Sequence, residues 1–369
     1  MRKTFLLIFT ILLITLITAN ADELSDKFSL SVNTYIDNTN SDIITTKLNT
    51  VKRLSEKYGI GIDAGYDAIS SATPLNRADN IDEDRDDEGN KDRFFSTVTG
   101  IYNDVVNNIS VSGYYSKESD YTGRSVFVNY SRIMNNDNTS ISTGISQSFD
   151  SWDISGLTED ERNDSQLNLS ASQFLTNTSQ VQLIYTLIYS DGFLASPYRN
   201  VDIGSEKIYE RLPSDRTAHA VAIKLIKLIN EPTSVHLYYR YYFDDWEIRS
   251  HTVSVDLYRD ITDYIVLGGS YRYYNQDEAS FTKKSDQYKP DDTYIAIDYK
   301  YSNFTSNTIG INLMLTPQWE FFSFIDWESA KFKISADYYI TSDNDWIKNW
   351  YGEDFIQAAI ISTSFEYLY

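Results

Sequence analysis

The sequence predicts an all-β protein, a closed antiparallel transmembrane β-barrel of about sixteen strands. From Lys27 onward, apolar and small polar residues alternate with a period of two, which is typical of strands with one apolar and one solvated face. The connections alternate between short polar turns, such as Asn135–Asn138, and longer segments, such as Asp191–Ser214. This asymmetry is typical of outer-membrane barrels, which have short periplasmic turns and longer extracellular loops.

Each expected strand is one stretch of this alternation. The strands are expected near 27–37, 42–55, 58–69, 93–103, 107–118, 123–134, 139–150, 163–175, 179–190, 215–229, 233–244, 247–260, 264–276, 295–315, 328–341 and 355–369. An even number places both termini on the periplasmic side. The least defined stretch is 291–327, which holds either one long strand over 295–315 or two shorter ones, so eighteen strands is the alternative.

The composition favours a barrel in lipid over a soluble β-sandwich and excludes several other classes. The polar face consists largely of Ser, Thr, Asn, Gln and Gly, which suits a solvated lumen, and Tyr and Phe flank the apolar face near strand ends. Asp and Glu number 53 against 32 Lys and Arg, for a net charge of −21, which argues against a nucleic-acid partner. There is no Cys, so neither a disulfide scaffold nor a thiolate metal site is expected.

The two ends of the chain predict its destination. Residues 1–21 combine Arg2 and Lys3 with an apolar run and an Ala-x-Ala triplet, as in a signal peptide, and the barrel is expected over 22–369; an anchor helix is the alternative. The last residues form one alternating face that ends on Tyr369, which resembles the C-terminal signal read by the barrel assembly machinery. Expected partners are therefore this machinery, outer-membrane lipid and lipopolysaccharide.

Three sequence motifs in the second half of the chain resemble those of a known family. They are YSDGFLASPYR at 189–199, PSDRTAHAV at 213–221 and YYRYYFDDWEIRSH at 238–251. Together they resemble a family of Gram-negative outer-membrane proteins catalogued as a domain of unknown function, over about 189–340. The resemblance implies an outer-membrane barrel and no established activity. Members often occur beside flavin-transfer and thioredoxin-like proteins, which implies a periplasmic redox partner, although this chain has no haem-attachment motif.

Strand parity predicts which side chains face the lumen. In the third to ninth strands the inward set is mostly small and neutral: Ser110, Ser112, Ser140, Ser142, Ser146, Asn168, Ser170 and Ser172. From the tenth strand onward a basic wall is expected from Lys224, Arg240, Arg272, Lys300, Lys331 and Lys333, with the acids Asp256, Asp298 and Asp337 among them. Such a wall predicts a passive channel for small polar or anionic solutes, because charged pore linings tune ion selectivity. The alternative is that these cations pair with acids and fill the barrel.

The loop 191–215 is expected to be functional because of its length and apolar content. It is predicted to fold inward as a constriction, with Arg199, Glu210, Arg211, Asp215 and Arg216 at the lumen. The alternative is an extracellular flap packed on neighbouring loops.

No catalytic or cofactor site is expected. His219, His236 and His251 lie on consecutive strands, but His236 has the opposite parity, so they should not share a metal. Asp82, Asp84 and Asp86 have the i, i+2, i+4 spacing of a calcium loop without its Gly and Glu, which makes them a weak metal candidate only. Besides a channel, the alternatives are a structural sheath or anchor for redox partners and an outer-membrane hydrolase. A homotrimer is the expected assembly if the barrel is porin-like.

Overall fold

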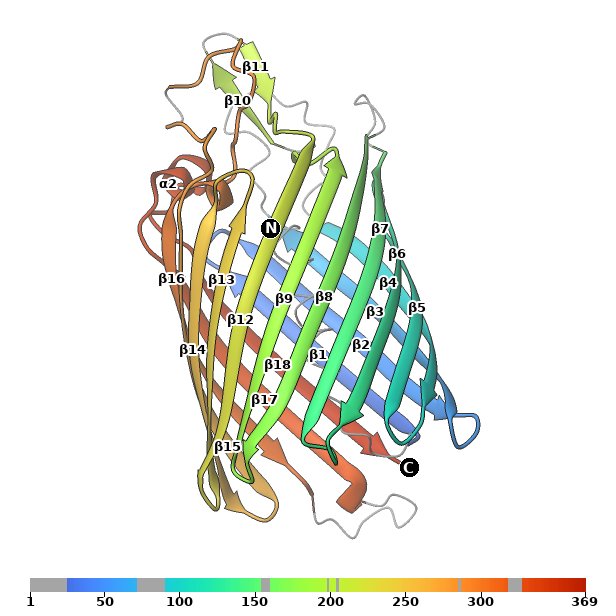
Figure 1. Cartoon of the computed structure of the whole chain (residues 1–369). Helices are drawn as coiled ribbons and strands as arrows, with labels where there is room; N and C mark the ends of the chain where they lie inside the picture. Colours follow the sequence, from blue (N-terminus) through green and yellow to red (C-terminus); the bar gives the residue numbers. More distant parts are fainter. Residues whose placement is uncertain are drawn as a thin grey trace.

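The computed structural model describes residues 25–71, 90–153, 160–197, 199–203, 206–284, 287–317 and 327–369. They form a closed barrel of sixteen antiparallel strands (Figure 1). The barrel closes where β1 (Lys27–Asp37) pairs with β18 (Gln357–Leu368), from Lys27 opposite Leu368 to Asp37 opposite Ala358. The predicted signal peptide and the Asp82, Asp84 and Asp86 loop lie outside the described residues.

The remaining barrel strands follow the predicted ranges closely. They are β2 (Ser41–Arg53), β3 (Tyr58–Ser71), β4 (Asn90–Asn103), β5 (Asn107–Lys117), β6 (Tyr121–Met134), β7 (Thr139–Trp152), β8 (Asp160–Thr176), β9 (Ser179–Gly192), β12 (Asp215–Asn230), β13 (Thr233–Asp244), β14 (Arg249–Thr262), β15 (Ile265–Gln276), β16 (Phe304–Leu315) and β17 (Ala330–Thr341). β10 (Asn200–Ile203) and β11 (Glu206–Tyr209) form a separate hairpin, so β12 pairs with β9. The barrel therefore has sixteen strands, as predicted, and not eighteen.

The outer surface of the barrel is apolar. Ile145, Ile309 and Ile311 are 60%, 60% and 63% exposed, and many other large apolar side chains on the strands are also exposed. A closed sheet pairs its backbone groups from strand to strand, which a surface in contact with hydrocarbon requires. The apolar outer face and the closed topology together make this a membrane-spanning barrel. No helix in the described part of the chain is long and apolar enough to cross a membrane.

Close packing on the inner face explains one small residue. Gly310 on β16 lies between Ser270 on β15 and Asp337 on β17. A Cβ atom at Gly310 would lie 1.9 Å from Asp337 Oδ1 and 2.5 Å from Ser270 Oγ. The side chains of the neighbouring strands therefore occupy the space that only glycine leaves open.

The predicted strand over 295–315 begins later than expected. Only Phe304–Leu315 joins the barrel, whereas Ile295 and Ile297 are buried among loop residues. Ile295 makes a single β-bridge with Arg211 in place of a strand pairing within the barrel wall. As a consequence, Asp298 and Lys300 lie in a loop, not on the barrel wall where the sequence placed them.

Candidate functional site

The first half of the barrel carries inward cations that parity arguments overlooked. The predicted inward serines do lie on this wall, but Lys47, Arg93 and Arg162 share it. Each of these cations meets a carboxylate on the same or the neighbouring strand: Lys47 meets Asp63 at 2.8 Å, Arg93 meets Asp67 at 2.5 Å and Arg162 meets Asp164 at 2.5 Å. The neutrality of this wall thus comes from ion pairs as well as from small polar residues.

The basic residues of the second half divide into three groups. Lys224 on β12 interacts with His236 and Asp256, which face each other across β13 and β14. Lys331 and Lys333 lie near the end of the barrel that carries Tyr369, where both interact with Glu366.

The third group, Arg240 on β13 and Arg272 on β15, has no carboxylate partner among the described residues. Arg240 lies over the ring of Tyr242 at 5.3 Å, and Arg272 lies over the ring of Tyr274 at 5.6 Å. Tyr242 and Tyr274 were missed as candidate lining residues. The signal was available, because the tetrapeptide Tyr-Arg-Tyr-Tyr occurs at both 239–242 and 271–274.

A cap of loops stands at the outer end of the barrel, opposite the chain end at Tyr369 (Figure 1). We define the cap as the described residues of 193–214, 245–248, 277–303 and 342–356, which include the hairpin β10–β11 and the short helix α2 (Asp345–Tyr351). The 191–215 segment packs on these neighbouring loops above the strands. The β10–β11 hairpin lies beyond the ends of the barrel strands, an arrangement that fits the predicted flap better than the predicted constriction (Figure 1).

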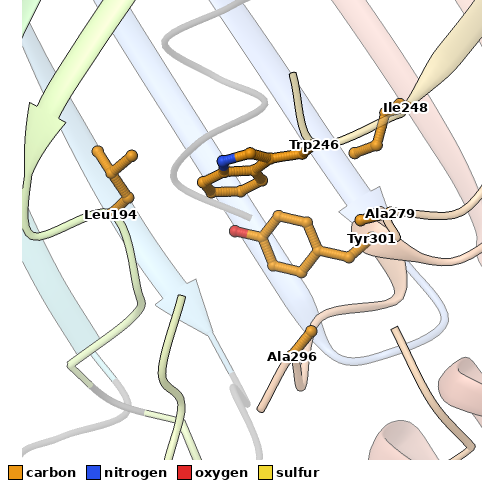
Figure 2. Close-up of a cluster of buried hydrophobic side chains, with 6 residues drawn as sticks. All are labelled: Leu194, Trp246, Ile248, Ala279, Ala296 and Tyr301. Atoms are coloured by element: carbon orange, nitrogen blue, oxygen red, sulfur yellow. The ribbon is translucent and has the colours of Figure 1, made fainter. Parts of the chain in front are cut away.

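Two apolar clusters hold the cap together. Leu194, Trp246 and Tyr301 come from three different loops and lie side by side with Ile248, Ala279 and Ala296 (Figure 2). The second cluster consists of Tyr288, Ile295, Ile297 and Trp346. Because both clusters combine loops that are distant in sequence, they fix the loops to one another.

Buried polar contacts complete the cap and account for the predicted loop residues. Glu210 accepts hydrogen bonds from Ser196 N at 2.7 Å and from Ile297 N at 3.0 Å. Arg199 Nη2 lies 3.2 Å from Asp298 Oδ2, and Lys300 Nζ lies 3.9 Å from the same oxygen. Burial alone would raise the pKa of Asp298, but attraction to Arg199 and Lys300 outweighs it and holds this pKa below its usual range.

The remaining loop candidates bind protein groups near the rim. Arg211 Nη2 donates to Pro290 O at 2.7 Å. Arg216 on β12 forms an ion pair with Asp244 at the end of β13, and Trp246 Nε1 donates to Asp215 O at 2.9 Å. These contacts join the loop to neighbouring loops and to the rim of the barrel.

The three histidines do not meet. His219 Nδ1 lies 2.9 Å from Tyr185 Oη and His251 Nδ1 lies 2.8 Å from Tyr239 Oη, both on the outward face. His236 faces inward on β13. Within the described ranges, no three His, Cys, Asp or Glu side chains are grouped to hold a metal ion.

The geometry and solved structures agree on the class of protein. The barrel is similar in fold to a bacterial polysaccharide outer membrane secretin, with 7% identity and a TM-score of 0.54 over 94% of this chain and 99% of that one. It is also similar to a loop L8 deletion mutant of OmpT, an outer membrane protein of Vibrio cholerae, with 8% identity and a TM-score of 0.50 over 93% and 98% of the two chains. The chain is an outer-membrane β-barrel.

A family model matches more than half of the chain. Residues 147–353 match the family described as "Protein of unknown function (DUF3570)", and the chain belongs to that family. The predicted resemblance to such a family is thereby confirmed. No curated protein matches the chain.

Proposed function

We propose that this protein is a passive outer-membrane channel for small polar solutes, with a preference for anions. The observation that carries the proposal is a closed sixteen-strand barrel whose inner face is mainly polar. Barrels of sixteen to eighteen strands enclose a bore wide enough for water, unlike eight-stranded barrels, which side chains fill. The two apolar clusters of the described residues consist of cap residues, with Tyr242 of the inner face packed against the first cluster, so they stabilise the mouth of the barrel.

The distribution of inward charge supports the anion preference. Pairs such as Lys47–Asp63 and Arg93–Asp67 cancel locally, whereas Arg240 and Arg272 keep their charge available to solutes. For an anion ~7 Å from both guanidiniums in water, Coulomb's law gives about 0.6 kcal/mol for each charge. The two together enrich anions about sevenfold at low salt, and added salt screens this effect.

Conductance in planar lipid bilayers tests the proposal. The refolded full-length mature barrel should give discrete current steps and a reversal potential that indicates anion preference in a potassium chloride gradient. Protein of the same batch that has not refolded is the control, because it carries the same detergent and contaminants. Current steps no more frequent than in this control would overturn the channel proposal.

Two other outcomes would favour the alternative functions. A barrel without conductance that co-purifies with a periplasmic protein would support a sheath or anchor. Hydrolysis of a lipid or peptide reporter that is lost when His236 is replaced by Ala would support an enzyme.

A further inference from the structure

The repeated Tyr-Arg-Tyr-Tyr sequence places equivalent groups on two strands that flank β14. On β13 and β15, the first and second tyrosines of each repeat face outward, and they are partly or largely exposed. Each arginine and the last tyrosine of its repeat have the opposite parity and face the lumen. Each repeat therefore presents a guanidinium stacked on a ring two residues further along the same strand.

β14 contributes hydroxyl groups between the two repeats. Thr252 is opposite Arg240 on one side and Tyr274 on the other. Ser254 is opposite Tyr238 on one side and Arg272 on the other. The two arginines are thus two strands and two residues apart, which corresponds to about 12 Å between their Cα atoms from standard strand spacings. Each guanidinium lies over the ring two residues further along its own strand, so both lie on the inner face on either side of β14.

Two acids near these arginines are engaged elsewhere. Asp244 accepts hydrogen bonds from Arg216, from Tyr242 Oη at 2.8 Å and from Ile248 N at 2.9 Å. Asp256 interacts with His236 and Lys224. Among the other guanidiniums that face inward or lie in the cap, each of Arg93, Arg162, Arg199 and Arg216 meets a carboxylate in the described structure.

The arrangement leaves two guanidiniums on the inner face with no carboxylate partner among the described residues. They lie close enough to repel one another. The tyrosine rings below them are themselves oriented, because Tyr242 donates to Asp244 and Tyr274 donates to Gln276 Oε1 at 2.6 Å. An anion bound at the two guanidiniums would offset this repulsion.

We propose that Arg240 and Arg272, with the Thr252 and Ser254 hydroxyls, form a binding site for an oxyanion. The ligand is the carboxylate or phosphate group of a small solute, because these groups match the planar array of guanidinium donors. This inference rests on the proposed channel function and names the solute class that the channel would retain during passage. Chloride is expected to bind more weakly, because a single spherical ion cannot form two parallel hydrogen bonds with one guanidinium.

Block of chloride current by inorganic phosphate tests the site in a conducting barrel. Phosphate and acetate should reduce the current of the wild-type barrel in a saturable manner. In R240Q/R272Q the concentration for half block should rise at least about tenfold, because charge-assisted hydrogen bonds are lost. R240K/R272K keeps the charge and should retain anion preference, but it should bind more weakly than the wild type. Block by phosphate but not acetate would identify a phosphate site, and the reverse a carboxylate site; both support the proposal.

The matched control removes two charges from the same side of the barrel. K331Q/K333Q should reduce anion preference but keep saturable block near the wild-type concentration. Equal loss of block in R240Q/R272Q and K331Q/K333Q, or conduction without any saturable block in the wild type, would overturn the site while leaving the channel intact.

A second measurement does not depend on conduction. An arginine-specific dicarbonyl reagent, followed by mass spectrometry of the folded barrel in detergent, should modify Arg240 and Arg272 faster than the paired Arg93 and Arg162. Inorganic phosphate should slow the modification of Arg240 and Arg272 only. Equal rates for all four, or no protection by phosphate or acetate, would refute the site even in a barrel that conducts. Protection in a barrel that does not conduct would keep the site and reject the channel.

Discussion

Glu210 is the residue whose replacement should release the cap most specifically. Its carboxylate accepts backbone N–H groups from two different loops, Ser196 N at 2.7 Å and Ile297 N at 3.0 Å. The residue is 4% exposed, so water cannot take over these bonds without opening the cap. Glu210→Ala leaves both amides buried without an acceptor.

The expected loss follows from the number and kind of these bonds. A hydrogen bond to a charged group contributes about 1.5–3 kcal/mol, so the two bonds contribute about 3–6 kcal/mol to the closed cap. A change of 1.4 kcal/mol alters an equilibrium tenfold. Local opening of the cap should therefore become about 10² to 10⁴ times more frequent.

Hydrogen exchange of the cap amides, followed by mass spectrometry, measures this opening. In Glu210→Ala, peptides containing Ser196 and Ile297 should exchange faster, whereas peptides from the barrel strands should not change. Glu206→Ala is the matched control, because Glu206 is exposed on β11 of the same hairpin. Unchanged exchange in Glu210→Ala, or equal acceleration in Glu206→Ala, would refute the role assigned to Glu210.

Three further predictions concern the barrel, the pH response and assembly. Gly310→Ala should lower the unfolding midpoint in urea, at a cost of about 1–3 kcal/mol, because the added methyl would meet the Asp337 carboxylate at 1.9 Å. Gly269→Ala is the control, because an added methyl there has nothing within 4 Å. Equal losses of stability in the two variants would contradict this reasoning. The pKa of Asp298 lies below its usual range in the cap, so its contribution to cap stability is complete above the unfolded-state pKa of about 4 and is lost as the pH falls below it. Cap tryptophan fluorescence should thus be constant from about pH 8 to pH 5 and change on further acidification; a change confined to the alkaline side would contradict this. Finally, we propose that Tyr369 is read during assembly, so its deletion should reduce the amount of folded barrel in the outer membrane, whereas Tyr369→Phe should not; equal amounts in all three forms would reject the proposal.

The fold was predictable because alternation reports directly on the two faces of a strand. Predicted and observed strands coincide within a few residues along most of the barrel, and the closing pair β1–β18 was implied by the even count. The alternation pattern gave a wrong strand start over 295–299, because it indicates that every second residue is buried but not which part of the protein buries it. There the buried side chains of Ile295 and Ile297 contact cap residues, which no local pattern distinguishes from a barrel wall.

The state of the lumen charges was only partly predictable. Parity places Arg240 and Arg272 on the face opposite the exposed Tyr239 and Tyr271, but it could not show which cations have partners. Arg216 pairs with Asp244 across 28 residues, and Arg93 pairs with Asp67 across 26. Such pairs depend on strand register, which is set by turn lengths and neighbouring side chains. The repeated Tyr-Arg-Tyr-Tyr motif, in contrast, can be recognised in the sequence without knowledge of the strand register.

The cap and the arginine site share a direct structural connection through Gln276. Its Nε2 donates to Lys300 O at 2.8 Å and Ser302 O at 2.7 Å, which ties the 277–303 loop to the end of β15. Its Oε1 accepts from Tyr274 Oη at 2.6 Å, and the Tyr274 ring lies under Arg272. One amide therefore positions both a cap loop and the aromatic support of a guanidinium. Because cap opening at this loop would free the amide, we expect the Tyr274 ring that supports Arg272 to be less firmly held when the cap is open.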